Sequence, residues 1–337
     1  MIKVGINGFG RIGRLATRII LKDYQKELEL VCLNTSGRVD STGWAHLFKY
    51  DTAYGRWPGK VKVKGNKMIV DGQPVPLLKE REPEKIPWGK YKAEIVIEST
   101  GVFRQEKDAR QHLRETVKKV VLSAPPKGDE LPMYVIGVNE DKIGNKKIIS
   151  CASCTTNCVA PVVKVVEENF GVAKALMSTI HAYTGDQRIL DGSHAKDLRR
   201  GRAAAVNIVP TTTGAAKATA KVYPQVKGVF DGLAIRVPVV TGSLTDFTFL
   251  TKRKVTVNQL NQAFKKAARG RLKGIVGVTK EPLVSSDIIG MDFSTLVDLS
   301  LTRVIGGNLV KVISWYDNEW GYARRLVEEV VLVGKKL

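Results

Sequence analysis

The stretch that decides the fold is Ile2–Gly13, which reads IKVGINGFGRIG. Its first part, Ile2–Ile6, is an apolar run of strand length. A G-x-G-x-x-G pattern follows at Gly8, Gly10 and Gly13 and opens a helix-like segment. In this setting the first glycine makes a tight turn, the second lets the backbone approach a pyrophosphate, and the third lets helix and strand pack closely. The stretch therefore predicts a dinucleotide-binding unit, with the helix N-terminus supplying N–H donors for the anion.

The rest of the first half continues the alternation of strands and helices. Apolar runs of strand length recur at Leu28–Leu33, Glu94–Glu98, Val120–Leu122 and Tyr134–Val138. A helical-looking stretch, Gln105–Val117, lies between two of them. The segment Lys60–Leu78 instead contains short alternating runs around Gly65-Asn66 and Asp71-Gly72, a pattern typical of small hairpins. We therefore expect a Rossmann-type, doubly wound parallel sheet with inserted hairpins.

The second half has a different pattern. A helix is predicted at Thr155–Phe170, ending at Gly171, and a second surface helix at Val257–Gly270. Longer strands are predicted at Ala173–Tyr183, Gly232–Val237, Ser243–Thr251 and Leu309–Tyr316, before a final helix at Tyr322–Val333. The whole chain is thus expected to be α/β. We assign residues 1–152 to the dinucleotide-binding domain, 153–317 to an α+β catalytic domain with a mainly antiparallel sheet, and 318–337 to a C-terminal helix returning to the first domain.

Composition excludes several classes of protein. The chain has 337 residues, of which 43% are hydrophobic and 26% charged, so it is neither disordered nor collagen-like. No apolar run reaches the roughly 18 residues of a membrane helix. The first residues lack the charged and apolar regions of a signal peptide. Four cysteines, Cys32, Cys151, Cys154 and Cys158, are too few for a disulfide scaffold. We expect a cytoplasmic protein.

The charge balance is strongly basic. Lys and Arg number 54 against 33 Asp and Glu, a formal net charge of +21. The stretch Phe247–Lys280 holds no acidic residue, and its basic residues include Lys252, Arg253, Lys254, Lys265, Lys266, Arg269, Arg271 and Lys273. Such a surface attracts anions and can bind nucleic acid without sequence preference. A solvated helix face is the favoured interpretation, and nucleic acid is kept as a second, weakly supported partner.

The end of the second strand indicates the dinucleotide. An NAD site usually carries Asp or Glu here, bound to the ribose hydroxyls. In this chain Asn34 is followed by Thr35, Ser36, Gly37 and Arg38, with no carboxylate. Two hydroxyls and an arginine can accept a 2′-phosphate, which a carboxylate would repel. We therefore favour NADP, with NAD as the alternative.

Cys154 is the candidate nucleophile. It lies between a strand end and a helix N-terminus, where the helix dipole favours the thiolate. Of four histidines, His181 ends an apolar strand and is the leading candidate for the base. An inert thiol beside an unrelated core histidine is the alternative. A metal site at Cys151-x-x-Cys154-x-x-x-Cys158 lacks a fourth cysteine nearby, so we expect no metal.

A hydroxyl, a carboxylate and an arginine follow His181 in the segment Thr184–Arg188, where the carboxylate is that of Asp186. Further along come Arg199, Arg200, Arg202 and the small-residue loop Pro210–Gly214, with Arg236 on a later strand. Phosphate binding uses this combination of groups. Together with a thiol and a dinucleotide, they suggest that a phosphorylated aldehyde is oxidised through a thioester.

The chain resembles phosphorylating glyceraldehyde-3-phosphate dehydrogenases, in particular the NADP-preferring type. The motifs that carry the resemblance are Ile6–Arg14, His46–Thr52, Ser99–Phe103, Ala152–Pro161, Thr211–Ala218 and Trp315–Tyr322. The Ala152–Pro161 segment, ASCTTNCVAP, is highly specific to that family. The resemblance therefore runs from one end of the chain to the other.

The resemblance implies a reversible reaction between D-glyceraldehyde 3-phosphate and 1,3-bisphosphoglycerate. Cys154 attacks the aldehyde, His181 takes the proton, hydride leaves to the nicotinamide, and inorganic phosphate cleaves the thioester. The implied phosphate-binding residues are Thr184, Asp186 and Arg236 for the substrate phosphate, and Ser153, Thr155, Thr213 and Gly214 for the attacking phosphate, with Arg200 between them. The implied cofactor-binding residues are Gly8, Phe9, Gly10, Arg11, Ile12, Thr35, Ser36, Arg38, Arg81, Ser99, Thr100, Gly101, Ser123, Ser193 and Asn318.

The resemblance also implies a homotetramer, in which a loop at about residues 185–206 reaches a neighbour's cofactor. In that loop Gly192-Ser193 aligns with the Leu-Pro pair of NAD-using members, and Thr35 aligns with their Asp, so both changes favour NADP. Ala195 looks like a one-residue insertion. Erythrose-4-phosphate dehydrogenase is the alternative enzyme, although Thr184 and Thr211–Ala218 argue against it. The physiological direction, glycolytic or biosynthetic as in gluconeogenesis and carbon fixation, is left open.

Overall fold

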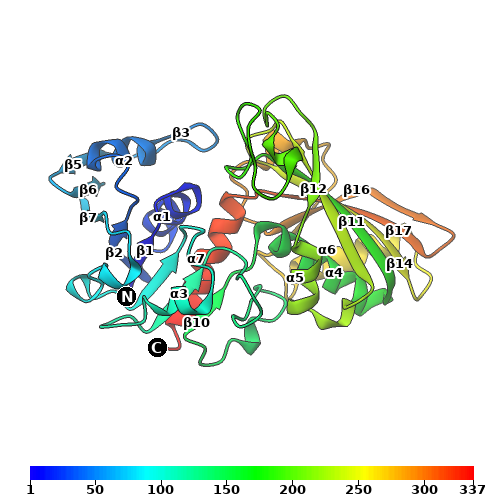
Figure 1. Ribbon diagram of the computed structural model, residues 1–337. Coiled ribbons are helices and arrows are strands. Elements are labelled where there is room, and N and C mark those ends of the chain that lie inside the picture. Colours follow the sequence, from blue (N-terminus) through cyan, green and yellow to red (C-terminus); the bar gives the residue numbers. More distant parts are fainter. The chain divides into compact units, whose positions relative to one another are not determined.

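The computed structural model describes residues 1–337, which form two compact units. The first comprises residues 1–134, 141–152 and 323–337, and the second comprises residues 135–140 and 153–322. Each unit is built around its own large sheet (Figure 1). No helix in the chain is long and apolar enough to cross a membrane.

The first unit holds an eight-stranded sheet in the order β10-β9-β8-β1-β2-β7-β6-β5. All pairs from β10 to β7 are parallel, and β7-β6-β5 is an antiparallel meander at one edge. The strands are β1 (Ile2–Asn7), β2 (Leu28–Asn34), β5 (Val61–Lys64), β6 (Lys67–Val70), β7 (Gln73–Leu78), β8 (Ile95–Glu98), β9 (Lys119–Leu122) and β10 (Ile148–Ser150). The predicted doubly wound sheet with inserted hairpins is confirmed. The short strands β3 (Tyr50–Asp51) and β4 (Gly55–Arg56) form a separate ladder.

Three helices and the C-terminal helix belong to this unit. They are α1 (Arg11–Asp23), α2 (Ser41–Lys49), α3 (Glu106–Arg110) and, from Ala323 onward, α7 (Trp320–Gly334). The apolar face of α1, including Leu15 and Ile19, is buried against the sheet. Gly334 of α7 lies close to the side chain of Ile2, so the two ends of the chain meet in this unit.

The second unit holds a seven-stranded, mainly antiparallel sheet in the order β12-β13-β11-β14-β17-β16-β15. Only the pairs β11-β13 and β15-β16 are parallel. The strands are β11 (Val172–Ala182), β12 (Val209–Thr212), β13 (Phe230–Val237), β14 (Ser243–Thr251), β15 (Val276–Thr279), β16 (Thr295–Ile305) and β17 (Leu309–Tyr316). The predicted α+β architecture of this half is therefore confirmed.

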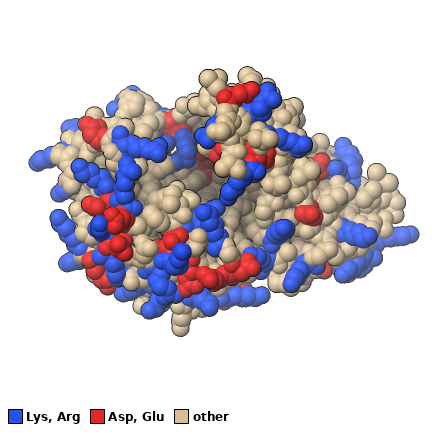
Figure 2. Space-filling model, in the orientation of Figure 1, with Lys and Arg blue, Asp and Glu red and all other residues tan.

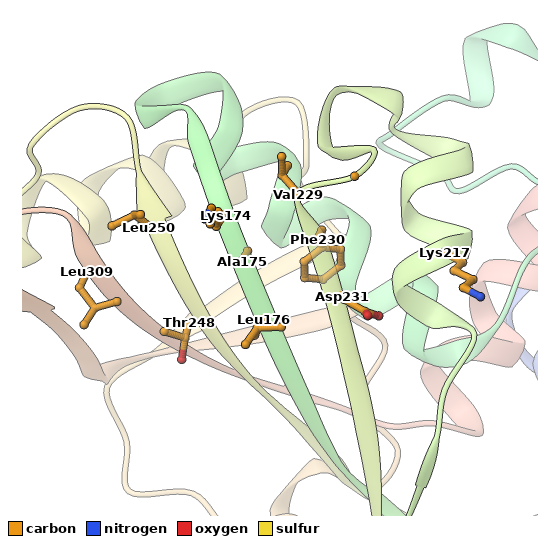
Figure 3. Close-up of a pocket in the computed structure, with 11 residues that line it drawn as sticks. Lys174, Ala175, Leu176, Lys217, Val229, Phe230, Asp231, Thr248, Leu250 and Leu309 are labelled. Atoms are coloured by element: carbon orange, nitrogen blue, oxygen red, sulfur yellow. The ribbon is translucent and has the colours of Figure 1, made fainter.

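The helices α4 (Cys154–Phe170), α5 (Ala215–Val222) and α6 (Val257–Arg269) pack against this sheet. Successive side chains of a strand point to opposite faces, and in β14 the alternate residues Phe247 and Phe249 are fully buried. The side chains between them point to the opposite face of the sheet, where Leu176 of the neighbouring strand β11 is 64% exposed. Figure 3 shows a cavity of about 730 Å³ on this uncovered face, with Leu176, Leu250 and Leu309 among its lining residues.

Some predicted elements differ from the structure. Tyr134–Val138 is not a strand, because Asn139 Oδ1 accepts a hydrogen bond of 2.8 Å from the backbone N–H of Val135 and closes a turn. The predicted helix Gln105–Val117 shrinks to Glu106–Arg110, and Glu115 beyond it has a left-handed φ of 54°. The strands β15 and β16 were not predicted, because polar residues interrupt the apolar pattern of β16. The strands predicted at Ser243–Thr251 and Leu309–Tyr316 are confirmed with those bounds.

Candidate active site

The glycine-rich turn joins β1 to α1 at the carboxyl end of the parallel sheet. Gly8 has φ of 100°, and a Cβ there would lie 2.6 Å from the backbone nitrogen of Thr100. The hydroxyl of Ser99 donates a 2.7 Å hydrogen bond to the Gly8 carbonyl. The Gly8 turn and the segment after β8 are therefore pressed together, with no room for a side chain between them.

The other two glycines of the motif have different constraints. A Cβ on Gly13 would overlap the carbonyl oxygen of Gly8, so the close packing of α1 on β1 requires glycine there. A Cβ on Gly10 would meet no protein atom within 4 Å. The protein itself does not require glycine at this position, whereas a ligand approaching the backbone would. No side chain caps the first turn of α1, so the residues present fit a pyrophosphate at this helix N-terminus.

The tip of β2 presents its predicted cofactor-selecting residues unequally. Thr35 is only 4% exposed, and its hydroxyl donates a 2.9 Å hydrogen bond to the Leu78 carbonyl. Ser36 and Arg38 are exposed and lie in the loop that Thr35 fixes. Thr35 therefore shapes the loop, and the groups available to a ligand are those of Ser36 and Arg38.

The remaining predicted cofactor residues of this unit occupy the same edge of the sheet or its rim. Ser99, Thr100 and Gly101 follow β8, and Ser123 follows β9, where its N–H donates to the Glu98 carbonyl. Phe9 is buried and stacks on Phe48, with ring centroids 6.4 Å apart. Arg11 pairs with Asp51 at 2.5 Å, Ile12 is half-buried, and Arg81 is exposed.

The thiol lies at the start of α4 in the second unit. Ser153 is the N-cap, and its hydroxyl accepts a 3.1 Å hydrogen bond from the Thr156 N–H. Cys154 is the first helical residue, and its Sγ lies 3.5 Å from Nε2 of His181, which is near the end of β11. The structure thus brings together the predicted nucleophile and base.

The imidazole of His181 is oriented from its other side. Nδ1 lies 2.7 Å from the carbonyl oxygen of Ala182, and Arg236 Nη1 contacts both Nδ1, at 2.5 Å, and that oxygen, at 3.0 Å. A guanidinium can only donate and a carbonyl can only accept, so Nδ1 meets a donor in Arg236 and an acceptor in Ala182. The tautomer with its proton on Nδ1 donates to Ala182 and leaves Nε2 as an acceptor facing the thiol, which is the form that general-base catalysis needs.

Burial and the neighbouring cation set the protonation of this pair. Burial, helped by the Arg236 guanidinium, lowers the pKa of His181 to about 3. Burial raises the pKa of the Cys154 thiol, while Arg236 and the hydrogen bond from Thr155 oppose the rise. Both shifts disfavour the charged forms, so the pair rests as a neutral thiol beside a neutral imidazole.

Tyr316, at the end of β17, is a site residue that the sequence analysis did not single out. Its buried ring meets His181 edge-on, with centroids 5.8 Å apart. Its hydroxyl lies 3.1 Å from Thr155 Oγ1 and 2.8 Å from Thr179 Oγ1. The ring therefore supports one face of the imidazole. The only signal in the sequence was its place inside the motif Trp315–Tyr322.

Three of the predicted phosphate-binding residues, Asp186, Arg200 and Arg236, lie near one another. Arg200 Nη1 lies 2.6 Å from Asp186 Oδ2, and Arg200 Nε donates a 2.8 Å hydrogen bond to Thr211. The charges of Arg200 and Asp186 both act on Arg236, which places the three near one another. An ionised carboxylate has no donor to offer a phosphate. Asp186 therefore contributes to this group through its ion pair with Arg200, which it holds in place. Thr184 is half-buried, and Thr213 and Gly214 immediately precede α5.

Asn318 is 5% exposed and firmly oriented. Its Oδ1 accepts hydrogen bonds from Ser243, at 2.7 Å, and Thr241, at 3.4 Å. Both donors are hydroxyls, so the amide nitrogen points the other way and remains a donor.

Ser193 is exposed, and its backbone carbonyl accepts a 2.8 Å hydrogen bond from Arg188. No group of three or more His, Cys, Asp or Glu side chains is arranged to hold a metal ion.

A dinucleotide-type sheet domain and a second domain with a buried thiol–imidazole pair are the features of a dinucleotide-dependent oxidoreductase with a cysteine as its candidate nucleophile. Comparison with known families agrees. Residues 2–106 match the glyceraldehyde 3-phosphate dehydrogenase NAD binding domain, and residues 153–318 match the C-terminal domain of the same enzyme. The chain belongs to the glyceraldehyde-3-phosphate dehydrogenase family.

Full-length relatives support this assignment. The chain is 53% identical to glyceraldehyde-3-phosphate dehydrogenase 2 of Streptomyces avermitilis, covering 100% of this chain and 99% of the relative. It is 53% identical to the Thermotoga maritima enzyme, covering 99% and 100%. It is also 50% identical to the chloroplastic enzyme B of Pisum sativum, covering 99% of this chain and 74% of the relative.

Changing the second and third glycines of the motif, Gly10 and Gly13, to alanine should have different effects. Gly13→Ala should lower the free energy of unfolding by about 1–3 kcal/mol through overpacking. Gly10→Ala should leave the unfolding temperature near that of the unchanged protein and weaken dinucleotide binding about tenfold or more. Thermal unfolding and dinucleotide titration measure the two effects. Unchanged affinity in Gly10→Ala would mean that no pyrophosphate approaches this turn.

His181→Asn should slow turnover by roughly 10²–10⁴-fold, since asparagine cannot take the thiol proton. It should also move the pH profile of Cys154 alkylation by iodoacetamide to higher pH. The sign follows because burial keeps the pKa of the thiol high once the proton acceptor is gone. The far-ultraviolet circular dichroism spectrum serves as the folding control. An alkylation profile identical to that of the unchanged protein would exclude proton transfer between the two residues.

Proposed function

We propose that this enzyme interconverts D-glyceraldehyde 3-phosphate and 1,3-bisphosphoglycerate with NADP as its preferred dinucleotide and NAD as the alternative. The observation that carries the chemical part is the 3.5 Å contact between Cys154 Sγ and His181 Nε2, with Nδ1 fixed by the Ala182 carbonyl. Family membership supplies the substrate.

The covalent steps are those that family membership implies for the thiol of Cys154. Its Sγ bonds to the aldehyde carbon while the thiol proton passes by way of His181 Nε2 to the former carbonyl oxygen, which becomes the hydroxyl of a thiohemiacetal. The bound dinucleotide would supply the hydride acceptor for the next step, in which the hydroxyl proton passes to His181 Nε2 and a thioester is left on Cys154. An oxygen of inorganic phosphate then attacks the thioester carbon, the C–S bond breaks, and the sulfur regains a proton from His181.

Two groups of residues are proposed to hold the phosphates. Arg236 and Thr184 would bind the substrate phosphate, with Asp186 positioning Arg200 between the two sites. Ser153, Thr155, Thr213 and Gly214 would bind the attacking phosphate near the start of α4. The proposal is supported by guanidinium groups near the thiol, because charge-assisted hydrogen bonds bind phosphate strongly. The amide nitrogen of Asn318 would hold the nicotinamide carboxamide.

The preference for NADP rests on the tip of β2. No carboxylate follows this strand, and exposed Ser36 and Arg38 lie in a loop that the buried Thr35 fixes. A hydroxyl and a guanidinium are suitable donors for a 2′-phosphate. Ser193 is exposed in the loop that would reach a neighbouring subunit's cofactor. We propose that these residues together select NADP.

A homotetramer is proposed from the uncovered face of the second sheet. On that face Leu176 is 64% exposed and lies beside Leu250 and Leu309 at a cavity of about 730 Å³ (Figure 3). Apolar surface of this kind is typical of a protein interface. By contrast, Lys and Arg are spread widely over the face seen in Figure 2, with Asp and Glu among them. A second copy of the chain is the occupant that we propose for the apolar face.

Cofactor preference is tested by initial rates with glyceraldehyde 3-phosphate and phosphate, using NADP and NAD at matched concentrations. NADP should give a kcat/KM about tenfold higher or more, equivalent to ~1.4 kcal/mol. Arg38→Gln should remove most of this preference by raising the KM for NADP alone. Arg253→Gln, an exposed arginine of the other unit, is the matched control. Higher efficiency with NAD in the unchanged enzyme would overturn the assignment to NADP.

The assembly is tested by sedimentation velocity. Leu176→Glu should lower the average mass of the particle, because a charge cannot be buried unpaired in an apolar interface. Val257→Glu on α6, which packs against the opposite face of the sheet, is the control and should leave the mass unchanged. A particle of one subunit in the unchanged protein would contradict the proposed tetramer.

A further inference from the structure

A buried polar network in the first unit has no part in the thiol chemistry. It consists of Asn7, Asn34, Trp88, Glu98 and His112, each no more than 3% exposed. Asn7 and Asn34 end β1 and β2, and Glu98 ends β8. Trp88 and His112 come from the connections on either side of β8. The network therefore lies under three neighbouring strand ends of the parallel sheet.

The direction of the hydrogen bonds around His112 is fixed by Trp88. An indole Nε1–H can only donate, and it lies 3.2 Å from His112 Nδ1. Nδ1 must therefore accept, so the ring carries its proton on Nε2. Nε2 lies 3.1 Å from Glu98 Oε2 and donates to it. Trp88 thus selects the tautomer that points a donor at the carboxylate.

The carboxylate of Glu98 receives donors from three other groups. Asn7 Nδ2 donates to Oε2 at 2.6 Å, and the Thr100 N–H donates to Oε1 at 2.8 Å. The Thr100 hydroxyl also donates to Oε1. With His112, four donors surround the group, so it acts only as an acceptor, which is the role of an ionised carboxylate. Such charge-assisted bonds are short and strong.

The network continues to the tip of β2. Asn34 Nδ2 donates to Asn7 Oδ1 at 2.7 Å, and Asn34 Oδ1 accepts a 2.9 Å bond from the Glu80 N–H. Asn34 Nδ2 also donates to the Glu80 carbonyl at 2.8 Å. An unbroken series of side-chain hydrogen bonds therefore joins the ends of β8, β1 and β2.

The segments held by this network are the ones predicted to face the dinucleotide. Asn7 immediately precedes Gly8, and Thr100 lies against Gly8 on the other side of the turn, where a Cβ on Gly8 would be 2.6 Å from the Thr100 nitrogen. Asn34 immediately precedes Thr35. A buried ion network is weak support for stability, since well-packed apolar residues often replace one at no cost. The adjoining core, which includes Cys32, Val96 and Val120, is apolar.

We propose that Glu98 and His112 are positioning residues for the dinucleotide. Glu98 sets the spacing between the Gly8 turn and Thr100, and His112, oriented by Trp88, holds the carboxylate in place. The proposal rests on the dinucleotide binding of the proposed function. Because their hydrogen bonds hold the segments on both sides of the Gly8 turn, Glu98 and His112 should govern dinucleotide affinity and leave the chemical step nearly unchanged.

Glu98→Gln is the first test, because it keeps the shape and replaces one acceptor oxygen by a donor. In one orientation the amide nitrogen of the glutamine faces the donors of Asn7 and His112, and in the other it faces those of Thr100, so a donor always meets a donor. The Kd for NADP and for NAD, measured by fluorescence titration, should rise about tenfold or more. The kcat at saturating dinucleotide should stay within about threefold, so the loss appears in KM. A fall in kcat with unchanged Kd would overturn the proposal.

A pair of variants at His112 keeps the test independent of the folding of Glu98→Gln. His112→Leu removes the donor and should weaken dinucleotide binding about tenfold, whereas His112→Gln retains a donor and an acceptor and should stay within about threefold. Thr116→Val is the matched control. It removes a side-chain hydrogen bond of 2.6 Å to the Ala93 carbonyl in the same unit, away from the turn, and should lower the unfolding temperature without changing Kd.

The outcomes separate this proposal from the one on which it rests. If the unchanged protein binds neither dinucleotide, the proposed function fails, and the positioning role fails with it. If the unchanged protein binds and His112→Leu behaves like Thr116→Val, with lower stability and unchanged Kd, the network is purely structural and this proposal alone is overturned.

Discussion

The close approach of Gly13 to the carbonyl of Gly8 is the constraint on which the nucleotide end of the molecule depends. Because only glycine fits at position 13, α1 can begin directly above the end of β1. The free N–H groups of its first turn then lie beside the turn, at the edge where Ser99, Thr100 and Thr35 also emerge. One steric requirement thus places the helix dipole, the phosphate donors and the cofactor-selecting loop together.

The two units use buried neutral histidines in opposite senses. In the second unit Nδ1 of His181 lies between a backbone carbonyl and Arg236, and Nε2 faces the thiol of Cys154. In the first unit His112 accepts from Trp88 at Nδ1 and directs Nε2–H at Glu98. The first arrangement places a ring nitrogen beside a thiol, and the second holds a carboxylate in place. In the first unit the indole N–H decides which nitrogen of the imidazole carries the proton.

Strong local patterns made much of this predictable from the sequence. The glycines of Ile2–Gly13 and the alternation of β14 and β17 each have one physical explanation. Cys154 was singled out by its place before a helix and within a family motif, and His181 by its place at the end of an apolar strand. The sequence did not reveal that Thr35 faces Leu78, that Asp186 binds Arg200, or that Tyr316 supports the imidazole. These depend on partners that are distant along the chain. Polar residues within β16 likewise concealed a strand that tertiary pairing stabilises.

The hydrogen bond from Thr35 to Leu78 has a consequence for how this enzyme can evolve. The hydroxyl that replaces the usual carboxylate is used to hold the backbone, so the loop keeps its shape whatever side chains follow. Exposed substitutions at positions 36 and 38 cost little folding free energy, usually within about 0.5 kcal/mol. Substitutions at these two exposed positions can therefore accumulate in a lineage while the backbone of the loop and the buried thiol–imidazole pair stay unchanged.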